Sequence, residues 1–195
     1  MATPKHRTRP RGTYFVTTNT WQRRALFRAE VAAEILEEML VQYRSRGDFL
    51  LHSYVIMPDH LHIILTPGIT SSLEKVVQLI KGGSARAIGK QLAMKFPVWQ
   101  PGFTEHEIRN EADFRQHVSY IDGNPVKAKL VSAVSEYRFS SASGKSVMDA
   151  WPLASGAKAP ASLAVSTAGL KPRPSGERVR DDSCFAVVAA MKVKR

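Results

Sequence analysis

The sequence predicts an α+β fold in which helices cover a small antiparallel sheet. Two observations support this prediction: apolar residues recur with strand and helix periods up to about residue 140, and the resulting elements alternate along the chain. Their order is strand, helix, two strands, helix, short strand and helix. With 195 residues, 44% of them hydrophobic, the chain is long enough for one domain with an appendage.

The first strand and the first helix follow from side-chain type and period. Residues 13–20 alternate and are rich in β-branched and aromatic side chains, as strands are. Residues 29–45 carry a stripe at helical spacing, made of Val31, Ile35, Met39 and Gln42-Tyr43, with Leu36 and Leu40 beside it. The run Arg46-Gly47-Asp48 is expected to end this helix.

A hairpin follows the first helix. Strands at 49–57 and 60–66 are joined by Pro58-Asp59, so they should pair antiparallel. A further short strand is expected near 99–106.

The second and third helices have recognisable ends. Ser71 and Glu74 have the spacing of a capping box, and helical periodicity continues to about residue 92. Gly82-Gly83 interrupts the second helix, so we expect a kink or a close approach of another helix there. The third helix should begin at Asn110 and end near Asn124, because Pro125 disfavours helical geometry in the residue before it.

The composition changes after residue 140. Residues 141–195 are rich in Ala, Ser, Pro, Gly and Lys, carry a net charge of +5 and hold few large apolar side chains. Such a composition cannot offset the entropy cost of ordering. We therefore expect a folded domain at 1–140 and a mostly disordered basic tail at 141–195.

The net charge of +11 favours polyanionic partners, nucleic acid first and an anionic membrane surface second, over a merely soluble basic protein. Cys184 is the single cysteine, which excludes an intrachain disulfide and a multi-cysteine zinc site. No apolar segment of signal-peptide length follows the basic start, and the apolar run at 185–191 is too short to span a bilayer. We expect a cytoplasmic protein.

Two pairs of polar residues are candidates for a functional site. His60 and His62 alternate on a strand, so they share one face and could bind a metal ion, or they could be ordinary histidines at the end of a hairpin. Tyr120 and Asn124 are neighbours on one face of the third helix. They could serve one small site, or be a half-buried aromatic and a helix-ending Asn-Pro.

Four separated segments then resemble the REP-associated tyrosine transposases, members of the HUH class of single-strand nucleases. They are MPDHLHIIL (57–65), WQPGFTEHEIRNEADF (99–114), YIDGNPVKAKLV (120–131) and YRFSS (137–141). The resemblance covers about residues 12–142 and is specific, because the four segments occur in the family's order. It implies the ferredoxin-like sheet of that class, which agrees with the element order above.

By position, the resemblance implies that His60, His62 and Asn124 bind a divalent metal, Mg²⁺ or Mn²⁺, and that Tyr120 is the nucleophile. The implied activity is that of a DNA transposase, which nicks and joins single-stranded DNA at repeated palindromic hairpins. Tyr120 would become linked to the 5′ phosphate and leave a free 3′ hydroxyl. No general base stands out; His106, Glu107 and His117 are candidates, each with a structural role as the alternative.

The chain departs from the family pattern near the proposed nucleophile. Where the family commonly has a histidine after Tyr-Ile and His-Gly after Asn-Pro-Val-Lys, this sequence has Asp122 and Ala128-Lys129. Gly123 is expected to loosen the last helical turn beside Asn124. These departures bear on the orientation of Asn124 and on the choice of DNA.

Basic side chains expected to contact DNA phosphates form an N-terminal arm and a group on or beside the helices that frame the site. They are Lys5, Arg7, Arg9 and Arg11, and Lys81, Arg86, Lys127 and Lys129. Tyr14, Trp21 and Trp99 could stack on unpaired bases, with core packing as the alternative for each.

Two other functions are compatible with these residues. A non-catalytic module on the same sheet would bind single-stranded nucleic acid without cleaving it, and its histidines would be structural. A metal-dependent hydrolase that uses water would cleave without forming a covalent adduct with the protein.

Overall fold

The structure, a computed structural model, describes residues 12–94 and 97–151. Its sheet has four antiparallel strands in the order β2-β3-β1-β4: β1 (Thr13–Asn19), β2 (Phe49–Met57), β3 (His60–Pro67) and β4 (Thr104–Ile108). The helices of the described residues are α1 (Glu30–Ser45), α2 (Leu73–Gln91) and α3 (Glu111–Lys127). Short 3₁₀ turns lie at Trp21–Arg23, Leu26–Arg28, Val134–Glu136 and Ser141–Ser143.

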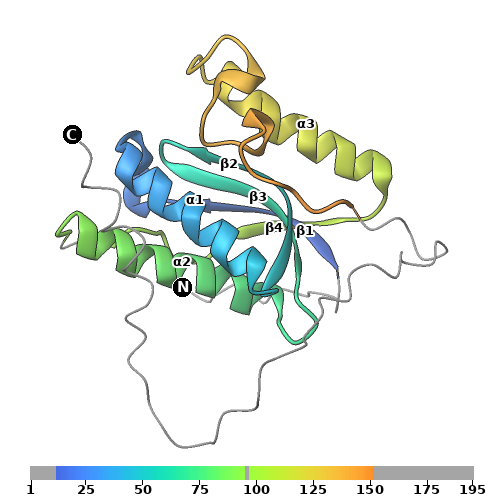
Figure 1. The fold of residues 1–195 in the computed structure, drawn as a ribbon, viewed down its shortest axis with the longest axis horizontal. Coiled ribbons are helices and arrows are strands. Elements are labelled where there is room, and N and C mark those ends of the chain that lie inside the picture. The colour runs from blue at the N-terminus through green and yellow to red at the C-terminus, as the bar shows by residue number, and fades with distance from the viewer. Residues whose placement is uncertain (1–11, 95–96, 152–195) are drawn as a thin grey trace, which may run out of the picture. The chain divides into compact units, whose positions relative to one another are not determined.

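This element order confirms the predicted α+β, ferredoxin-like fold. The order βαββαβ up to β4, with β3 between β1 and β2 in the sheet, is that of the ferredoxin-like motif. Helices α1 and α2 cover one face of the sheet and α3 covers the other (Figure 1). No described helix is long and apolar enough to cross a membrane.

The two faces of the sheet bury different amounts of apolar surface. On the face of α1 and α2, residues such as Leu61, Ile63 and Leu65 of β3 belong to the large hydrophobic core. On the α3 face, a much smaller cluster includes Ile64 and the α3 residue Ile121. Because side chains alternate along a strand, His60 and His62 point to the α3 face. The smaller cluster therefore leaves part of that face to polar side chains.

The hairpin and the first helix lie where the sequence predicts them. Met57 pairs with His60 across the Pro58-Asp59 turn. Helix α1 buries Ile35, Leu36, Leu40 and Tyr43, whereas Val31 is 41% exposed. The predicted stripe is therefore correct apart from Val31 and Gln42, which are exposed. The predicted strand near 99–106 lies slightly later, at Thr104–Ile108.

The predicted capping box at Ser71 and Glu74 is wrong by one residue. Ser72 is the N-cap of α2, and its hydroxyl accepts a hydrogen bond from the Lys75 amide. The Ser71 amide instead donates to the Gly68 carbonyl and so belongs to the preceding turn. Serine at either position is a good N-cap residue, and the turn at Gly68 decides between the two.

The glycine pair in α2 allows a close approach to α1. A Cβ atom on Gly83 would lie 2.0 Å from the Tyr43 hydroxyl oxygen and 2.5 Å from Met39 Cε, whereas one on Gly82 would meet nothing within 4 Å. The helix continues through both glycines. Of the two expectations for this pair, a close helix approach is correct at Gly83.

Alanine substitutions at the two glycines should change stability in opposite directions. Gly82→Ala removes the helix penalty of glycine and should stabilise the protein by about 0.5–1 kcal/mol. Gly83→Ala gains the same amount but forces the buried Tyr43 ring to move, which costs about 1–3 kcal/mol in a packed core, so its net effect should be destabilising. Urea unfolding of both variants tests this pair, and equal effects would contradict the close packing at Gly83.

The third helix ends later than the sequence predicts. Asn110 is its N-cap, as expected, but α3 runs through Pro125 to Lys127, so the predicted end near Asn124 is wrong. The Leu130 amide donates to the Pro125 carbonyl and the Lys129 amide to the Val126 carbonyl, with Lys129 at φ 57°. This Schellman arrangement ends the helix three residues beyond the proline prediction.

The folded part also extends beyond the predicted domain boundary at 140. The Asp149 carboxylate accepts bonds from Arg44 Nε (2.8 Å) and Nη2 (2.7 Å) and from the Leu51 amide (2.7 Å). The Trp151 ring packs on Phe114 with centroids 4.6 Å apart. Residues 141–151 are therefore folded onto the domain, and the prediction of disorder is wrong for them. Residues 152–195 lie outside the described residues.

Candidate functional site

The two histidines of β3 face each other through their ring nitrogens. His60 Nε2 lies 3.1 Å from His62 Nε2, with the rings nearly perpendicular. In octahedral coordination with bonds of about 2.1 Å, neighbouring ligand atoms are about 3.0 Å apart. The separation of the two nitrogens therefore fits a pair of ligands of one metal ion.

Each histidine is oriented by a partner on its other ring nitrogen. His60 Nδ1 lies 2.6 Å from Asp59 Oδ1, and His62 Nδ1 lies 2.7 Å from Thr17 Oγ1. The ionised Asp59 carboxylate only accepts, so His60 Nδ1 carries the hydrogen and neutral His60 keeps a lone pair on Nε2. Partners of this kind on the outer nitrogen are typical of metal-binding histidines.

The environment of His62 keeps its imidazole neutral. Burial, followed by the nearby His60 and Arg23, lowers the pKa of His62 to about 3, against the opposing effect of Asp59. A metal ligand must be deprotonated, so at neutral pH no proton competes for this ring. The donor set and its electrostatics thus suit a divalent cation.

Tyr120 lies against this histidine pair. Its ring centroid is 5.3 Å from that of His62 and 5.8 Å from that of Phe15, and its side chain is 42% exposed. Lys127 Nζ lies 5.3 Å from the centre of the Tyr120 ring. Helix α3 therefore brings a half-exposed phenol and a cation to the edge of the histidine site, although Tyr120 and His62 are far apart in the sequence.

Asn124 lies on the same face of α3, one turn after Tyr120. Its Nδ2 donates a hydrogen bond of 2.6 Å to the Tyr120 carbonyl. The amide oxygen, which is the atom that binds metals, is left free of this bond. The role of Asn124 as a third ligand stays a prediction.

Gly123, expected to loosen the end of the helix, lies within α3. The departure Asp122 lies half-buried on α3, and burial raises the pKa of its carboxyl group. Neither departure interrupts the helix that carries Tyr120.

Arg23 and its turn were not anticipated as part of the site. Arg23 Nη1 lies 3.3 Å from Asp59 Oδ2 and from Asn19 Oδ1. Gln22 and Arg23 both have positive φ, 54° and 55°, which is uncommon for residues other than glycine. The turn thus holds a 60% exposed guanidinium beside the carboxylate that orients His60.

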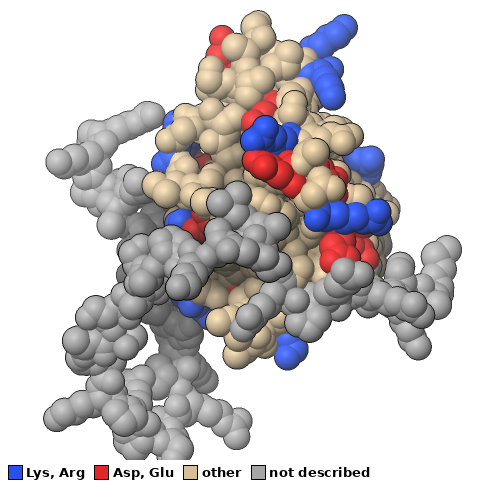
Figure 2. All heavy atoms as spheres, turned by 90° about the vertical axis from the view of Figure 1, so that its right-hand side faces the viewer, with Lys and Arg blue, Asp and Glu red and all other residues tan. Residues whose placement is uncertain are grey.

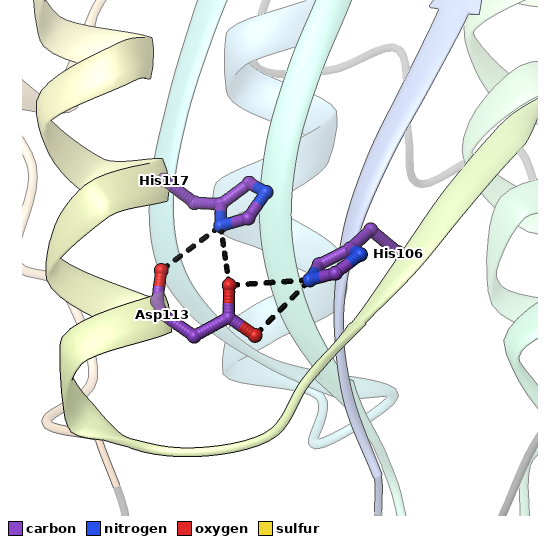
Figure 3. A group of neighbouring side chains, drawn as sticks. All are labelled: His106, Asp113 and His117. Carbon is purple, nitrogen blue, oxygen red and sulfur yellow. Dashed lines mark hydrogen bonds and ion pairs between the residues drawn. The ribbon is translucent and has the colours of Figure 1, made fainter.

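The suggested general bases His106 and His117 are bonded to Asp113 (Figure 3). The Phe15 ring contacts both His117 and Tyr120, with centroid distances of 4.9 and 5.8 Å. These contacts give neither histidine a link to the Tyr120 hydroxyl, and the identity of a general base stays open.

Several predicted DNA contacts have structural roles instead. Tyr14 and Trp99 are buried, 1% and 7% exposed, and Trp99 Nε1 donates to Ser84 Oγ, so core packing is the correct reading for both. Lys81 Nζ donates to the carbonyls of Gln100 and Gly102, and burial lowers the pKa of Lys81. The Lys81 side chain thus holds the segment before β4 in place. Trp21 is half-buried.

The other basic residues predicted to contact DNA fall into two groups: some are exposed on the surface, and the rest lie outside the described residues. Arg86, Lys127 and Lys129 are exposed, whereas Lys5, Arg7, Arg9 and Arg11 lie outside the described residues. Figure 2 shows that, on the face it presents, basic side chains are interspersed with acidic ones instead of forming one continuous patch.

The positive charge of the chain is concentrated outside its described part. The described residues carry fifteen Lys and Arg against fourteen Asp and Glu, almost a neutral balance. Residues 1–11 carry four basic and no acidic side chains, and 152–195 carry eight basic and three acidic ones. Non-specific attraction to a polyanion therefore depends mainly on the two ends of the chain.

Sequence reasoning missed Thr17, Phe15 and Arg23, and it read Asp59 only as a turn residue. Thr17 is the cross-strand partner of His62 in the β1–β3 register. Alternation along residues 13–20 places Phe15 and Thr17 on one face, but only the β1–β3 pairing brings them beside His62. Asp59 directly before His60 was the one local signal available.

Comparisons with known proteins identify relatives of this chain. A family model described as "Transposase IS200 like" matches residues 10–124, which include both histidines, Tyr120 and Asn124. The REP-associated tyrosine transposase of Escherichia coli (strain K12) is 34% identical over 130 residues, covering 66% of this chain and 75% of that protein. The solved structure of a REP-associated tyrosine transposase bound to a REP hairpin matches with a TM-score of 0.62 and 32% identity, over 72% of this chain and 82% of that one.

Proposed function

Because this chain belongs to the IS200-like transposase family, we propose that it nicks and rejoins single-stranded DNA through a covalent 5′-phosphotyrosine intermediate on Tyr120. The observation that carries the proposal is the position of Tyr120, whose ring lies 5.3 Å from that of His62 at the edge of a histidine pair. A nucleophile beside two metal-type ligands is the arrangement that phosphodiester cleavage needs.

The cleavage step exchanges one phosphoester bond for another. The Tyr120 oxygen attacks phosphorus and loses its proton, while the bond from phosphorus to the 3′ oxygen breaks and that oxygen takes up a proton. The products are a phosphotyrosine linked to the 5′ end of the downstream fragment and a free 3′ hydroxyl on the upstream fragment. Attack of a 3′ hydroxyl on the phosphotyrosine reverses these changes, so strands can be joined without an external energy source.

The residues around Tyr120 would orient these groups. Phe15 and His62 hold the phenol ring by edge contacts, and Lys127 lies over that ring with its charge close to where a phosphate would approach. Exposed Arg23 is bonded to Asp59, the carboxylate that orients His60. Two cations thus border the site and can bind phosphate oxygens.

His60 and His62, with Asn124 as the third ligand, would hold a divalent metal, which we propose to be Mg²⁺ or Mn²⁺. When bound, such an ion supplies charge stabilisation at the non-bridging oxygens of the phosphate. The Nε2 separation of 3.1 Å and the neutral state of His62 support this assignment.

The proposed substrate is a palindromic hairpin with a single-stranded flank. This choice rests on the likeness to a transposase solved with a REP hairpin, which is 32% identical to this chain.

A denaturing gel with end-labelled DNA tests the proposal. With a 3′ label and Mn²⁺, the labelled fragment should migrate with the protein, because the 5′ phosphate is attached to Tyr120. With a 5′ label, a shortened free fragment with an extendable 3′ hydroxyl should appear. Binding without cleavage would indicate the non-catalytic module, and cleavage without a protein-linked band would indicate the water-using hydrolase.

Removal of residues 152–195 should weaken DNA binding at low salt without unfolding the domain. The segment contributes a net charge of +5, so the slope of log affinity against log salt should fall by up to ~3.5 for single-stranded DNA. Fluorescence anisotropy at several salt concentrations measures this slope. An unchanged slope would assign the phosphate contacts to the rest of the chain.

The exact end of the truncated chain matters for this test. A chain ending at Trp151 should keep the melting temperature of the full protein. A chain ending at Ser140 loses the Asp149–Arg44 ion pair and the packing of Trp151 on Phe114, and should melt at a lower temperature.

A further inference from the structure

A second group of metal-binding side chains lies on the α3 face of the sheet. It consists of His106 on β4 and of Asp113 and His117 on α3 (Figure 3). His106 Nε2 is 3.0 Å from Asp113 Oδ2, and His117 Nδ1 is 3.0 Å from Asp113 Oδ1. The two imidazole rings are stacked, 4.6 Å apart and 17° from parallel. Both rings thus turn a nitrogen toward one carboxylate.

The nitrogens and the carboxylate have the separations of ligands to a single ion. One ligand atom from each residue lies within 4.8 Å of the other two. Ligands of a tetrahedral zinc ion, with bonds of about 2.0–2.1 Å, are about 3.3 Å apart. The His106 side chain is 42% exposed, so it is free to make the small adjustment that a common ion requires.

Without a metal, each imidazole must carry its hydrogen on the nitrogen that faces Asp113. A carboxylate only accepts hydrogen bonds, so both His106 Nε2 and His117 Nδ1 must then donate to Asp113. His117 Nδ1 also lies 2.9 Å from the Asp113 carbonyl oxygen, a second acceptor. A divalent cation would replace these two hydrogens, with one nitrogen of each ring and one Asp113 carboxylate oxygen as its ligands.

We propose that His106, Asp113 and His117 form a zinc site, separate from the histidine pair of β3. Two imidazole nitrogens and one carboxylate oxygen suit Zn²⁺ better than Mg²⁺, and three protein ligands leave a fourth position for water. Among the described residues, no contact joins this group to His60 or His62 directly. The Phe15 ring contacts both groups, at 4.9 Å from His117 and 5.4 Å from His62.

Zinc at this position would cross-link β4 to the first turns of α3. Asp113 is the residue whose amide is capped by Asn110, so it belongs to the start of the helix. Tyr120 follows seven residues later, two turns along the same face. The ion would therefore fix the end of the helix that carries Tyr120 over the sheet. Zinc binding itself is independent of the proposed cleavage chemistry.

Equilibrium dialysis of the full chain against ZnCl₂ tests the site. The background is the variant His60→Ala/His62→Ala, which removes the other pair of ligands. It should bind one equivalent of zinc, and its melting temperature should rise with zinc concentration. Adding His106→Ala should weaken this binding by at least ~10-fold, and Asp113→Asn should do the same. Because Asp113 also bonds the Arg109 amide, the exposed His106 is the decisive position.

A matched control distinguishes the site from general effects of charge. Asp122→Asn, in the same background, removes a carboxylate from the same helix but outside this group, so zinc binding should be unchanged. Full zinc binding in the background, lost with His106→Ala and kept with Asp122→Asn, is the expected result. No bound zinc in the background, or binding that His106→Ala leaves intact, would overturn the proposal.

Discussion

Replacing Tyr120 by phenylalanine is expected to abolish cleavage while DNA binding and folding persist. The substitution removes only the hydroxyl, and the ring can keep its contacts with Phe15 and His62. The side chain is 42% exposed, so the free energy of unfolding should change by no more than about 1 kcal/mol. A phenyl ring cannot attack phosphorus, so the protein-linked band on a denaturing gel should disappear. Anisotropy with the same hairpin should show unchanged affinity, because phosphate contacts position the DNA.

A second tyrosine provides a matched control for this experiment. The Tyr137 hydroxyl donates a hydrogen bond of 2.8 Å to the Ile56 carbonyl, and burial raises the pKa of Tyr137 to about 12. Tyr137→Phe should therefore lose about 1 kcal/mol of stability and keep cleavage. Normal cleavage by Tyr120→Phe would contradict the nucleophile assignment and favour a hydrolase that uses water.

Local patterns predicted those parts of the site that lie within one element. Alternation on a strand placed His60 and His62 on one face, and helical spacing placed Tyr120 and Asn124 on another. Neither pattern indicates how far the histidine pair lies from Tyr120 and Asn124. That depends on how α3 crosses β3, which is set by contacts such as Ile121 against Ile64, between residues far apart in the sequence.

The errors have two origins. Pro125 ends a helix by local rules, but the bonds of Lys129 and Leu130 to the preceding turn carry α3 past it. Composition predicted disorder after residue 140, yet Asp149 finds Arg44 on α1, a partner 105 residues away. Thr17 could be recognised as the partner of His62 only through the β1–β3 register. For Asp149 and Thr17 the deciding contact is long-range, whereas at Pro125 the local Schellman turn outweighed the local preference of proline.

Removal of either imidazole should cost at least ~100-fold in cleavage rate, since a bound metal contributes several kcal/mol of transition-state stabilisation. The two substitutions should differ in their effect on folding. Because His60 lies at the end of the hairpin, His60→Ala should change the melting temperature only slightly. His62 is 5% exposed, and His62→Ala leaves Thr17 Oγ1 without its partner, which should cost about 1–3 kcal/mol of stability. Single-turnover cleavage over a range of Mn²⁺ concentrations, with thermal melts of the same samples, separates the two effects.

A structural histidine in the same sheet shows whether the metal response belongs to this pair. His52 is also 5% exposed, and its ring bonds Thr66 Oγ1 and the Asp149 carbonyl, both at 2.9 Å. His52→Ala should therefore destabilise the protein at least as much as His62→Ala, yet leave the Mn²⁺ dependence of cleavage unchanged. If His60→Ala and His62→Ala behaved like His52→Ala, and wild-type cleavage needed no metal, the histidine pair would be structural. If His60→Ala lost Mn²⁺-dependent cleavage at an unchanged melting temperature, the pair would be assigned to catalysis. The substitution that disturbs folding least would then have one of the largest effects on the cleavage rate.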